Sequence, residues 1–123
     1  MNIQKLNSAI EELKTNLGVG LLATDIFDSA EKQSIAGWNT NPQACAVFGQ
    51  ITEGMNNALS ESQFPTLGKY YLLNLVSNKL VMVIPLGDYQ WGMLLDKSKI
   101  SLGLVLNIAL PKAISAFEEA LIG

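Results

Sequence analysis

The side chains that can do chemistry in this chain are limited by two absences. All eight basic residues are lysines, and the 123 residues include no histidine and no arginine. Without histidine, Ser-His-Asp triads, Cys-His pairs and histidine-zinc sites are excluded. Without arginine, the chain has no bidentate fork for phosphate or guanine and no arginine finger. We therefore predict no catalytic residue and a protein that is not an enzyme.

Carboxylates are the remaining candidates for acid-base or metal chemistry. Asp25, Asp28 and Glu31 do not have the spacing of an EF-hand loop, and we interpret them as part of a solvated hairpin turn. Glu11-Glu12 and Glu118-Glu119 are adjacent pairs on predicted helices, so their side chains point in different directions and do not form an acid-base dyad. The pattern predicts no metal site.

Cys45 and a short glycine motif are the last candidates. As the single cysteine, Cys45 cannot form a disulfide within the chain, which fits a reducing compartment. It follows a predicted helix start that would lower a thiol pKa, but no basic residue is near, so packing is favoured over a redox role. Gly18-Val19-Gly20 precedes a strand and lacks the third glycine of a dinucleotide loop. We expect no cofactor.

The length is typical of one domain spanning residues 1–123. The net charge is −3 and only 15% of residues are charged, so the surface is poor in charge or partly covered by a partner. An acidic chain with scattered lysines is a poor nucleic-acid binder. The first residues are too polar for a secretory signal, and the apolar run 100–110 is about half a membrane span. We expect a cytoplasmic protein without membrane insertion.

Hydrophobic periodicity predicts three helices. Residues 3–17 place the apolar residues Ile3, Leu6, Ile10, Leu13 and Leu17 three and four positions apart, and Gly18 is the predicted end of the helix. A second helix begins at Pro42, capped by Asn41 or Thr40, and runs to about Ser62. Its glycines, Gly49 and Gly54, lower helix propensity and suggest close approach by another element. The predicted inward face of this helix consists of Ala44, Val47, Phe48, Ile51, Met55, Ala58 and Leu59. The opposite face consists of Cys45, Gly49, Gln50, Glu53, Asn56 and Asn57.

The third helix spans residues 101–121, and Pro111 must kink or split it. Its predicted inward residues are Leu102, Val105, Ile108 or Ala109, Ile114, Phe117 and Leu121.

Five segments have strand character: residues 19–27, 33–38, 69–76, 79–86 and 89–96. Ser77-Asn78 and Gly87-Asp88 are predicted two-residue connections, the second typical of a type II′ hairpin. Strand alternation sends Tyr70 and Tyr71 to opposite faces. The element order predicts an α+β fold, an antiparallel sheet with helices on its faces.

The sequence resembles the roadblock/LC7 family, which includes dynein light chains and bacterial partners of Ras-like GTPases. The resemblance covers nearly the whole chain and rests on the element order and on particular segments. These are the glycine-led strand 18–25, Ser34-Ile35-Ala36-Gly37, the helix opening Asn41-Pro42 and the meander from Tyr70 to Leu95. It implies an α-β-β-α-β-β-β-α sandwich with a five-stranded antiparallel sheet and helices on its faces.

The resemblance also implies a homodimer, in which residues 42–62 and 69–76 of two subunits pair into one continuous sheet. The side chains assigned to this interface are Val47, Ile51, Met55, Tyr70, Leu72 and Asn74. The outer face of the second helix would be the surface for another partner, with Gln50, Glu53, Asn57 and Glu61. From composition alone, that face is only a solvated helix surface.

We therefore expect a non-catalytic homodimeric regulator or scaffold that binds a Ras-like small GTPase or a larger protein assembly. An arginine finger supplied in trans accelerates GTP hydrolysis by about 10³–10⁵, and this chain has none to supply. It could accelerate hydrolysis only by ordering the switch loops of the GTPase itself. Two alternatives stay open: a small-molecule-sensing domain, which predicts an apolar pocket, and an assembly scaffold that binds irrespective of nucleotide.

Overall fold

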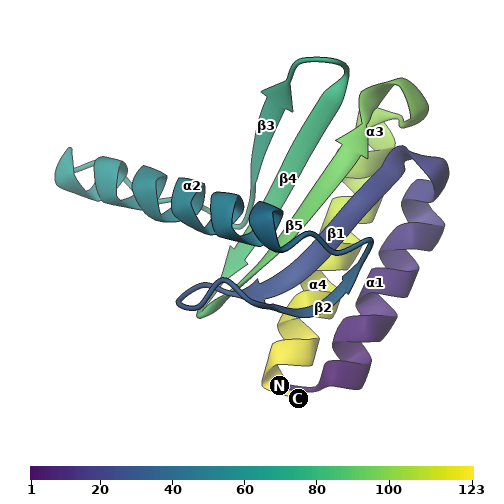
Figure 1. Cartoon of the computed structure of the whole chain (residues 1–123), viewed down its shortest axis with the longest axis horizontal. Helices are drawn as coiled ribbons and strands as arrows, with labels where there is room; N and C mark the ends of the chain where they lie inside the picture. The colour runs from purple at the N-terminus through teal and green to yellow at the C-terminus, as the bar shows by residue number, and fades with distance from the viewer.

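The computed structural model describes residues 1–123 and contains one five-stranded antiparallel sheet between two unequal helical layers (Figure 1). The strand order is β2-β1-β5-β4-β3, so β2 and β3 are the edges. The predicted α+β fold is confirmed. The elements are α1 Ile3–Leu17, β1 Leu21–Asp28, β2 Ser34–Trp38, α2 Pro42–Glu61, β3 Tyr71–Leu75, β4 Lys79–Leu86, β5 Tyr89–Asp96, α3 Leu102–Leu104 and α4 Leu110–Ile122.

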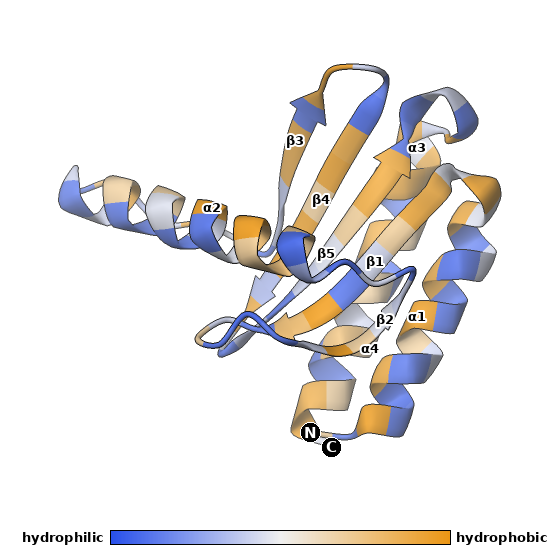
Figure 2. Cartoon of the chain, viewed as in Figure 1, coloured by the Kyte–Doolittle hydropathy of each residue, from blue (hydrophilic) through white to orange (hydrophobic).

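The main core lies between the sheet and the pair of helices α1 and α4. Twenty buried residues form it, several of them from β4 and β5, and Figure 2 shows that most of β4 and the second half of β5 are hydrophobic. Trp91 and Phe117 meet edge to face, with ring centroids 5.7 Å apart. The Trp91 indole N–H donates to Thr24 Oγ1 at 2.7 Å, which satisfies a buried polar group. This face carries most of the apolar burial that stabilises the fold.

The hydrophobic periodicity of residues 3–17 predicted the bounds of α1 and four of the five residues that the helix buries. Leu6, Ile10, Leu13 and Leu17 are buried, whereas Ile3 in the first turn is 51% exposed. The helix ends at Gly18, whose φ of 57° lies in the left-handed region that glycine adopts without strain. A 3₁₀ turn over Gly18–Gly20 follows, so β1 begins two residues later than predicted.

The two hairpins of the meander differ. Leu86 pairs with Tyr89, and Gly87 has a φ of 59°, so the Gly87-Asp88 connection is the two-residue turn predicted. In the other hairpin Leu75 pairs with Lys79, so the connection contains Val76 as well as Ser77-Asn78. The prediction of a two-residue connection was wrong there. Ser77 and Asn78 have positive φ angles and form the tight turn, and Val76 before them is not paired with β4.

Pro111 interrupts the last helix as expected, but without separating it into two distant pieces. Residues Val105–Ala109 form a π-helical turn, closed by the Leu110 N–H donating to the Val105 carbonyl, and α4 follows at once. The wider turn accommodates the proline ring, which would meet the carbonyl four residues earlier in an α-helix. Ala109, not Ile108, is buried, and Leu102 is 51% exposed, against the prediction that it faces inward. None of the helices could cross a membrane.

Candidate interaction surface on α2 and β3

Helix α2 lies alone on the second face of the sheet and touches it through a narrow stripe of small residues. Only Cys45, Gly49 and Thr52 are buried among its twenty residues. The Phe48 ring covers β5 at Gly92, where a Cβ would lie 2.7 Å from Phe48 Cδ2. Lys32 packs its aliphatic stem against Gly49. The close approach predicted from Gly49 is therefore present, while Gly54 faces open space.

The prediction of the inward face of α2 was correct in part: Phe48, Ile51 and Met55 pack against the sheet, but the residues in closest contact with it were assigned to the opposite face or not assigned. Cys45 and Gly49, assigned to the face opposite the core, are its two most closely packed small residues. The large apolar residues lie to one side of this stripe and are only half-buried or exposed. The reason is steric, since a helix that approaches a sheet closely needs small side chains at the contact.

A buried carboxylate fixes the N-terminus of α2. Asp25 on β1 is 6% exposed and accepts from Ser34 Oγ at 2.7 Å and from the Asn41 backbone N–H at 3.2 Å. The Asn41 side chain in turn caps the helix by accepting from Gln43 N at 3.0 Å. Asp25 therefore ties β1, β2 and α2 together, and its assignment to a solvated turn was wrong.

Asp28 and Glu31 do form the predicted turn. Asp28 Oδ1 accepts from the backbone N–H groups of Ala30 and Glu31 at 2.8 and 2.9 Å.

Cys45 is an inert packing residue. Its burial, and then the neighbouring Asp25 carboxylate, raise the pKa of the thiol to about 12. Because the thiolate is the reactive form, the thiol stays protonated at neutral pH. The structure thus agrees with packing rather than with the redox alternative.

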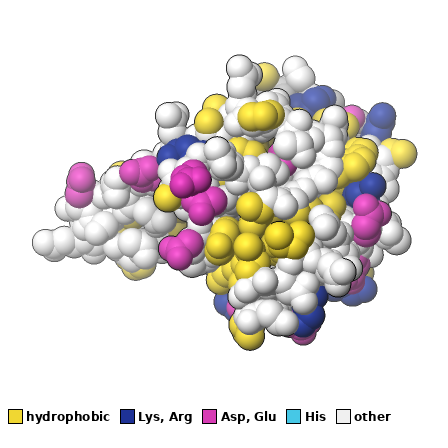
Figure 3. All heavy atoms as spheres, turned by 60° about the horizontal axis from the view of Figure 1, so that its bottom comes forward, with side chains coloured by type: hydrophobic (Ala, Val, Ile, Leu, Met, Phe, Trp, Pro, Cys, Tyr) yellow, Lys and Arg dark blue, Asp and Glu magenta, His cyan; other side chains and the backbone are white.

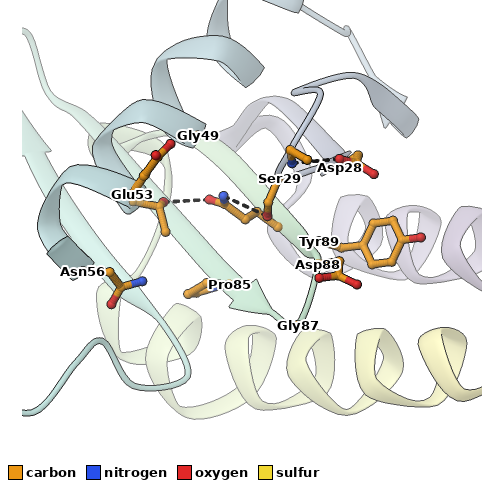
Figure 4. Close-up of a pocket in the computed structure, with 12 residues that line it drawn as sticks. Asp28, Ser29, Gly49, Glu53, Asn56, Pro85, Gly87, Asp88 and Tyr89 are labelled. Atoms are coloured by element: carbon orange, nitrogen blue, oxygen red, sulfur yellow. Dashed lines mark hydrogen bonds between the residues drawn. The ribbon is translucent and has the colours of Figure 1, made fainter. Parts of the chain in front are cut away.

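A chain of hydrogen bonds holds the middle of α2 where apolar packing is thin. Tyr71 OH and Thr52 Oγ1 lie 2.6 Å apart. Thr52 donates to Gln90 Oε1 at 2.7 Å, and Gln90 Nε2 donates to Ser29 Oγ at 3.1 Å (Figure 4). Because Thr52 gives its proton to Gln90, Tyr71 donates to Thr52. The chain joins β3, α2, β5 and the loop after β1.

Beside this chain is an open cavity of about 650 Å³ between α2 and two loops of the sheet. The acidic residues Asp28, Glu53 and Asp88 line it (Figure 4), together with the buried Thr52 and Gln90. Figure 3 shows acidic side chains gathered where the protruding helix meets the body of the molecule. The lining is mostly polar, unlike the apolar pocket that the small-molecule-sensing alternative predicts.

The apolar side of α2 is left incomplete. Ile51 and Met55 are half-buried against a small cluster of Tyr71, Val81 and Val83, and Val47 is 48% exposed. Figure 1 shows the C-terminal part of α2 extending past the edge of the sheet beside β3. Such an overhang presents apolar surface with no neighbour in its own chain.

Edge strand β3 adjoins this overhang, and its two faces divide the predicted interface residues. Strand alternation puts Tyr71 and Leu73 on the α2 side, where both belong to the small cluster. Leu72 packs against the main core instead, and Tyr70 borders a cavity lined by α4. Asn74 lies on the same face of β3 as Leu72, and its side-chain oxygen accepts a hydrogen bond from Lys97 Nζ. The six assigned side chains thus lie on both faces of the edge.

The four residues assigned to partner binding are all exposed on α2: Gln50, Glu53, Asn57 and Glu61. Glu53 alone also lines the acidic cavity. Sequence reasoning missed the roles of Thr52, Gln90 and Asp25. The signal available was a polar residue within a mostly apolar strand, for Asp25 and Gln90, or beside the apolar residues of a helix, for Thr52; such residues require partners when they are buried.

Comparisons with known proteins place this arrangement among solved structures. No family model and no curated protein matches the sequence. MglB of Myxococcus xanthus superposes with a TM-score of 0.81 at 13% identity, over 97% of this chain and 89% of that one. A roadblock/LC7 domain from Streptomyces avermitilis gives 0.67 at 9%, over 95% and 98%. A structure described as MglB with a tetrameric arrangement gives 0.72 at 12%, over 95% and 90%.

At these identities the likeness establishes the fold. The chain has the roadblock/LC7 fold, which the sequence resemblance predicted. The fold alone does not determine the function, since one fold can carry unrelated activities.

Proposed function

We propose that this roadblock/LC7-fold chain is a non-catalytic homodimeric regulator or scaffold that binds a Ras-like small GTPase in the cytoplasm. The observation that carries the proposal is the unfinished α2–β3 side, where an apolar helix overhang adjoins an unpaired strand edge. The fold shared with MglB, and a solved MglB in a tetrameric arrangement, support self-association and a GTPase-related role.

In the proposed dimer the β3 strands of two subunits pair and each α2 lies over the joint. Pairing would satisfy the free N–H and C=O groups of the edge and remove a site for uncontrolled strand addition. Val47, Ile51 and Met55 would supply the apolar contacts from α2. On β3, Leu73 and Leu75 would contact these α2 residues, because strand alternation puts them on the same face as Tyr71. Leu72 and Asn74 would take part through their backbone.

The GTPase would bind the side of α2 that remains exposed in such a dimer, with Gln50, Glu53, Asn57 and Glu61. These residues are polar and solvent-accessible, as is typical of a non-obligate surface. Any effect on GTP hydrolysis would come from ordering the partner's switch loops, because the chain has no arginine to insert.

A pull-down on the immobilised protein tests this function. Lysate would be applied with a non-hydrolysable GTP analogue or with GDP, and the bound proteins identified by mass spectrometry. A Ras-like protein retained with one nucleotide and lost from a Glu53→Lys, Asn57→Lys double variant supports a regulator. A Lys112→Glu variant on α4 serves as the control and should retain it. A larger assembly held with either nucleotide would instead make the chain a scaffold, and retention of no partner would contradict both.

A further inference from the structure

Three turns are packed together at the end of the sheet where β1 and β4 begin and β5 finishes (Figure 1). The Lys97 backbone N–H donates to the Asn78 carbonyl at 2.7 Å, joining the segment after β5 to the β3–β4 hairpin. Gly20 lies against the same segment, since a Cβ there would be 3.0 Å from the Lys99 carbonyl oxygen. We call residues 18–20, 76–79 and 96–104 the basic end.

Charge is separated along the strand direction. The basic end has Lys79, Lys97 and Lys99 against a single carboxylate, Asp96. Asp96 is itself engaged, accepting from Ser98 N–H at 3.0 Å and Ser98 Oγ at 2.6 Å.

The opposite end of the sheet, formed by the turns at 28–33 and 86–89, has three acidic residues against one lysine. A chain with a net charge of −3 therefore concentrates three of its eight lysines at one end.

The same end exposes aliphatic side chains from each of its three segments. Val76 is 87% exposed, Val19 77%, Leu102 51% and Leu104 38%. Turn positions ordinarily carry polar residues, and Val76 leaves the strand ladder beside a tight Ser77-Asn78 turn. Aliphatic tips between lysines are therefore a specific feature of this end.

We propose that the basic end docks peripherally on a membrane surface containing anionic lipid. Lysines near such a surface are attracted by its negative potential, while their aliphatic stems and neighbouring apolar residues enter the headgroup region. A protein partner would favour a continuous patch with aromatic anchors and few lysines. Separate protrusions from three turns suit a fluid lipid interface, which needs no fixed complementary shape. This inference is independent of the proposed GTPase function.

Vesicle co-sedimentation of the full chain tests the proposal. The probes are vesicles of phosphatidylcholine alone and of phosphatidylcholine with phosphatidylserine. We expect binding only to the second, weakening as salt rises. Changing Lys79, Lys97 and Lys99 together to Gln should reduce partitioning by about 100-fold, at about fivefold for each lysine. Val76→Ser with Leu102→Ser should also weaken binding, with no change in net charge.

The matched control changes Lys5, Lys69 and Lys112 to Gln, which alters the net charge equally but leaves the basic end intact. It should bind as the unmodified protein does. Circular dichroism of each variant establishes that it is folded. Equal losses in the two triple variants, or binding to both vesicle types alike, would overturn the proposal. So would failure to bind either vesicle type, which would leave an acidic protein surface as the occupant to test.

Discussion

The two faces of the sheet are built by different means. Under α1 and α4, twenty buried residues pack into a continuous apolar core. Under α2, Tyr71, Val81 and Val83 form a small buried cluster and Phe27 is buried near Gly92, while hydrogen bonds through Thr52 and Asp25 hold the helix in position. The first face supplies stability, whereas the second orients a helix and leaves its apolar side incomplete. This division is what we expect of a fold that keeps one layer for another chain.

The largest expected effect comes from truncating a matched residue on each face. Phe117→Ala removes a fully buried ring that contacts Trp91, and we expect a loss of about 3–5 kcal/mol in the free energy of unfolding. Phe48→Ala, on the α2 face, should cost about 1–2 kcal/mol in the monomer because its ring is only partly buried. Urea denaturation measures both. Equal losses would break the distinction between the faces.

A charge on the apolar side of α2 should act on assembly rather than on the fold. We expect Ile51→Glu to raise the dimer dissociation constant by about 100-fold or more, about 3 kcal/mol, while the far-ultraviolet circular dichroism spectrum is unchanged. Gln50→Glu, which adds the same charge at the adjacent exposed position, should leave assembly intact. Analytical ultracentrifugation distinguishes them. If both variants dissociate alike, the effect is one of net charge and the interface assignment fails.

Leu72→Asp, on strand β3, tests whether a predicted interface residue contributes to the fold or to assembly. Leu72 packs against the main core, so we expect this variant to unfold the chain instead of giving a folded monomer. A folded monomer would mean that Leu72 contributes chiefly to the interface.

The hydrogen-bond chain predicts a smaller effect. Thr52→Val keeps the side-chain shape but leaves Tyr71 OH and Gln90 Oε1 without their partner, which should cost about 1–3 kcal/mol. Thr15→Val on α1, where the hydroxyl bonds only to its own helix at an exposed position, should cost less than about 0.5 kcal/mol. Hydrogen exchange should show faster opening of α2 in the first variant. Unchanged α2 protection would count against the chain as its anchor.

The smallest effect is a dependence on alkaline pH. The Cys45 thiol ionises near 9 when unfolded and near 12 when folded. Between those values the unfolded state has released a proton that the folded state retains, so stability falls as pH rises, by at most about 1.4 kcal/mol per unit. Urea denaturation of the unmodified protein and of Cys45→Ala, compared at increasing pH, measures the difference. Parallel pH profiles would mean that the pKa of Cys45 is the same in the folded and unfolded protein, which would contradict the burial of its thiol.

Sequence periodicity predicted the elements better than it predicted their contacts. Helix 3–17 and the five strands followed from local patterns, and the fold from their order. The orientation of α2 did not follow, because the large apolar side chains Ile51 and Met55 were expected at the contact, whereas the sheet accepts the smaller Cys45 and Thr52. The burial of Asp25 depends on a long-range bond to Asn41. No local pattern encodes either contact.

In the dimer that we propose, a second copy of the chain completes the α2–β3 side. Sedimentation velocity of the unmodified protein at micromolar concentration tests it most directly, because no substitution perturbs the fold. We expect a single species with the mass of a dimer, which dissociates on dilution without unfolding. A species with the mass of one chain at every concentration would contradict it.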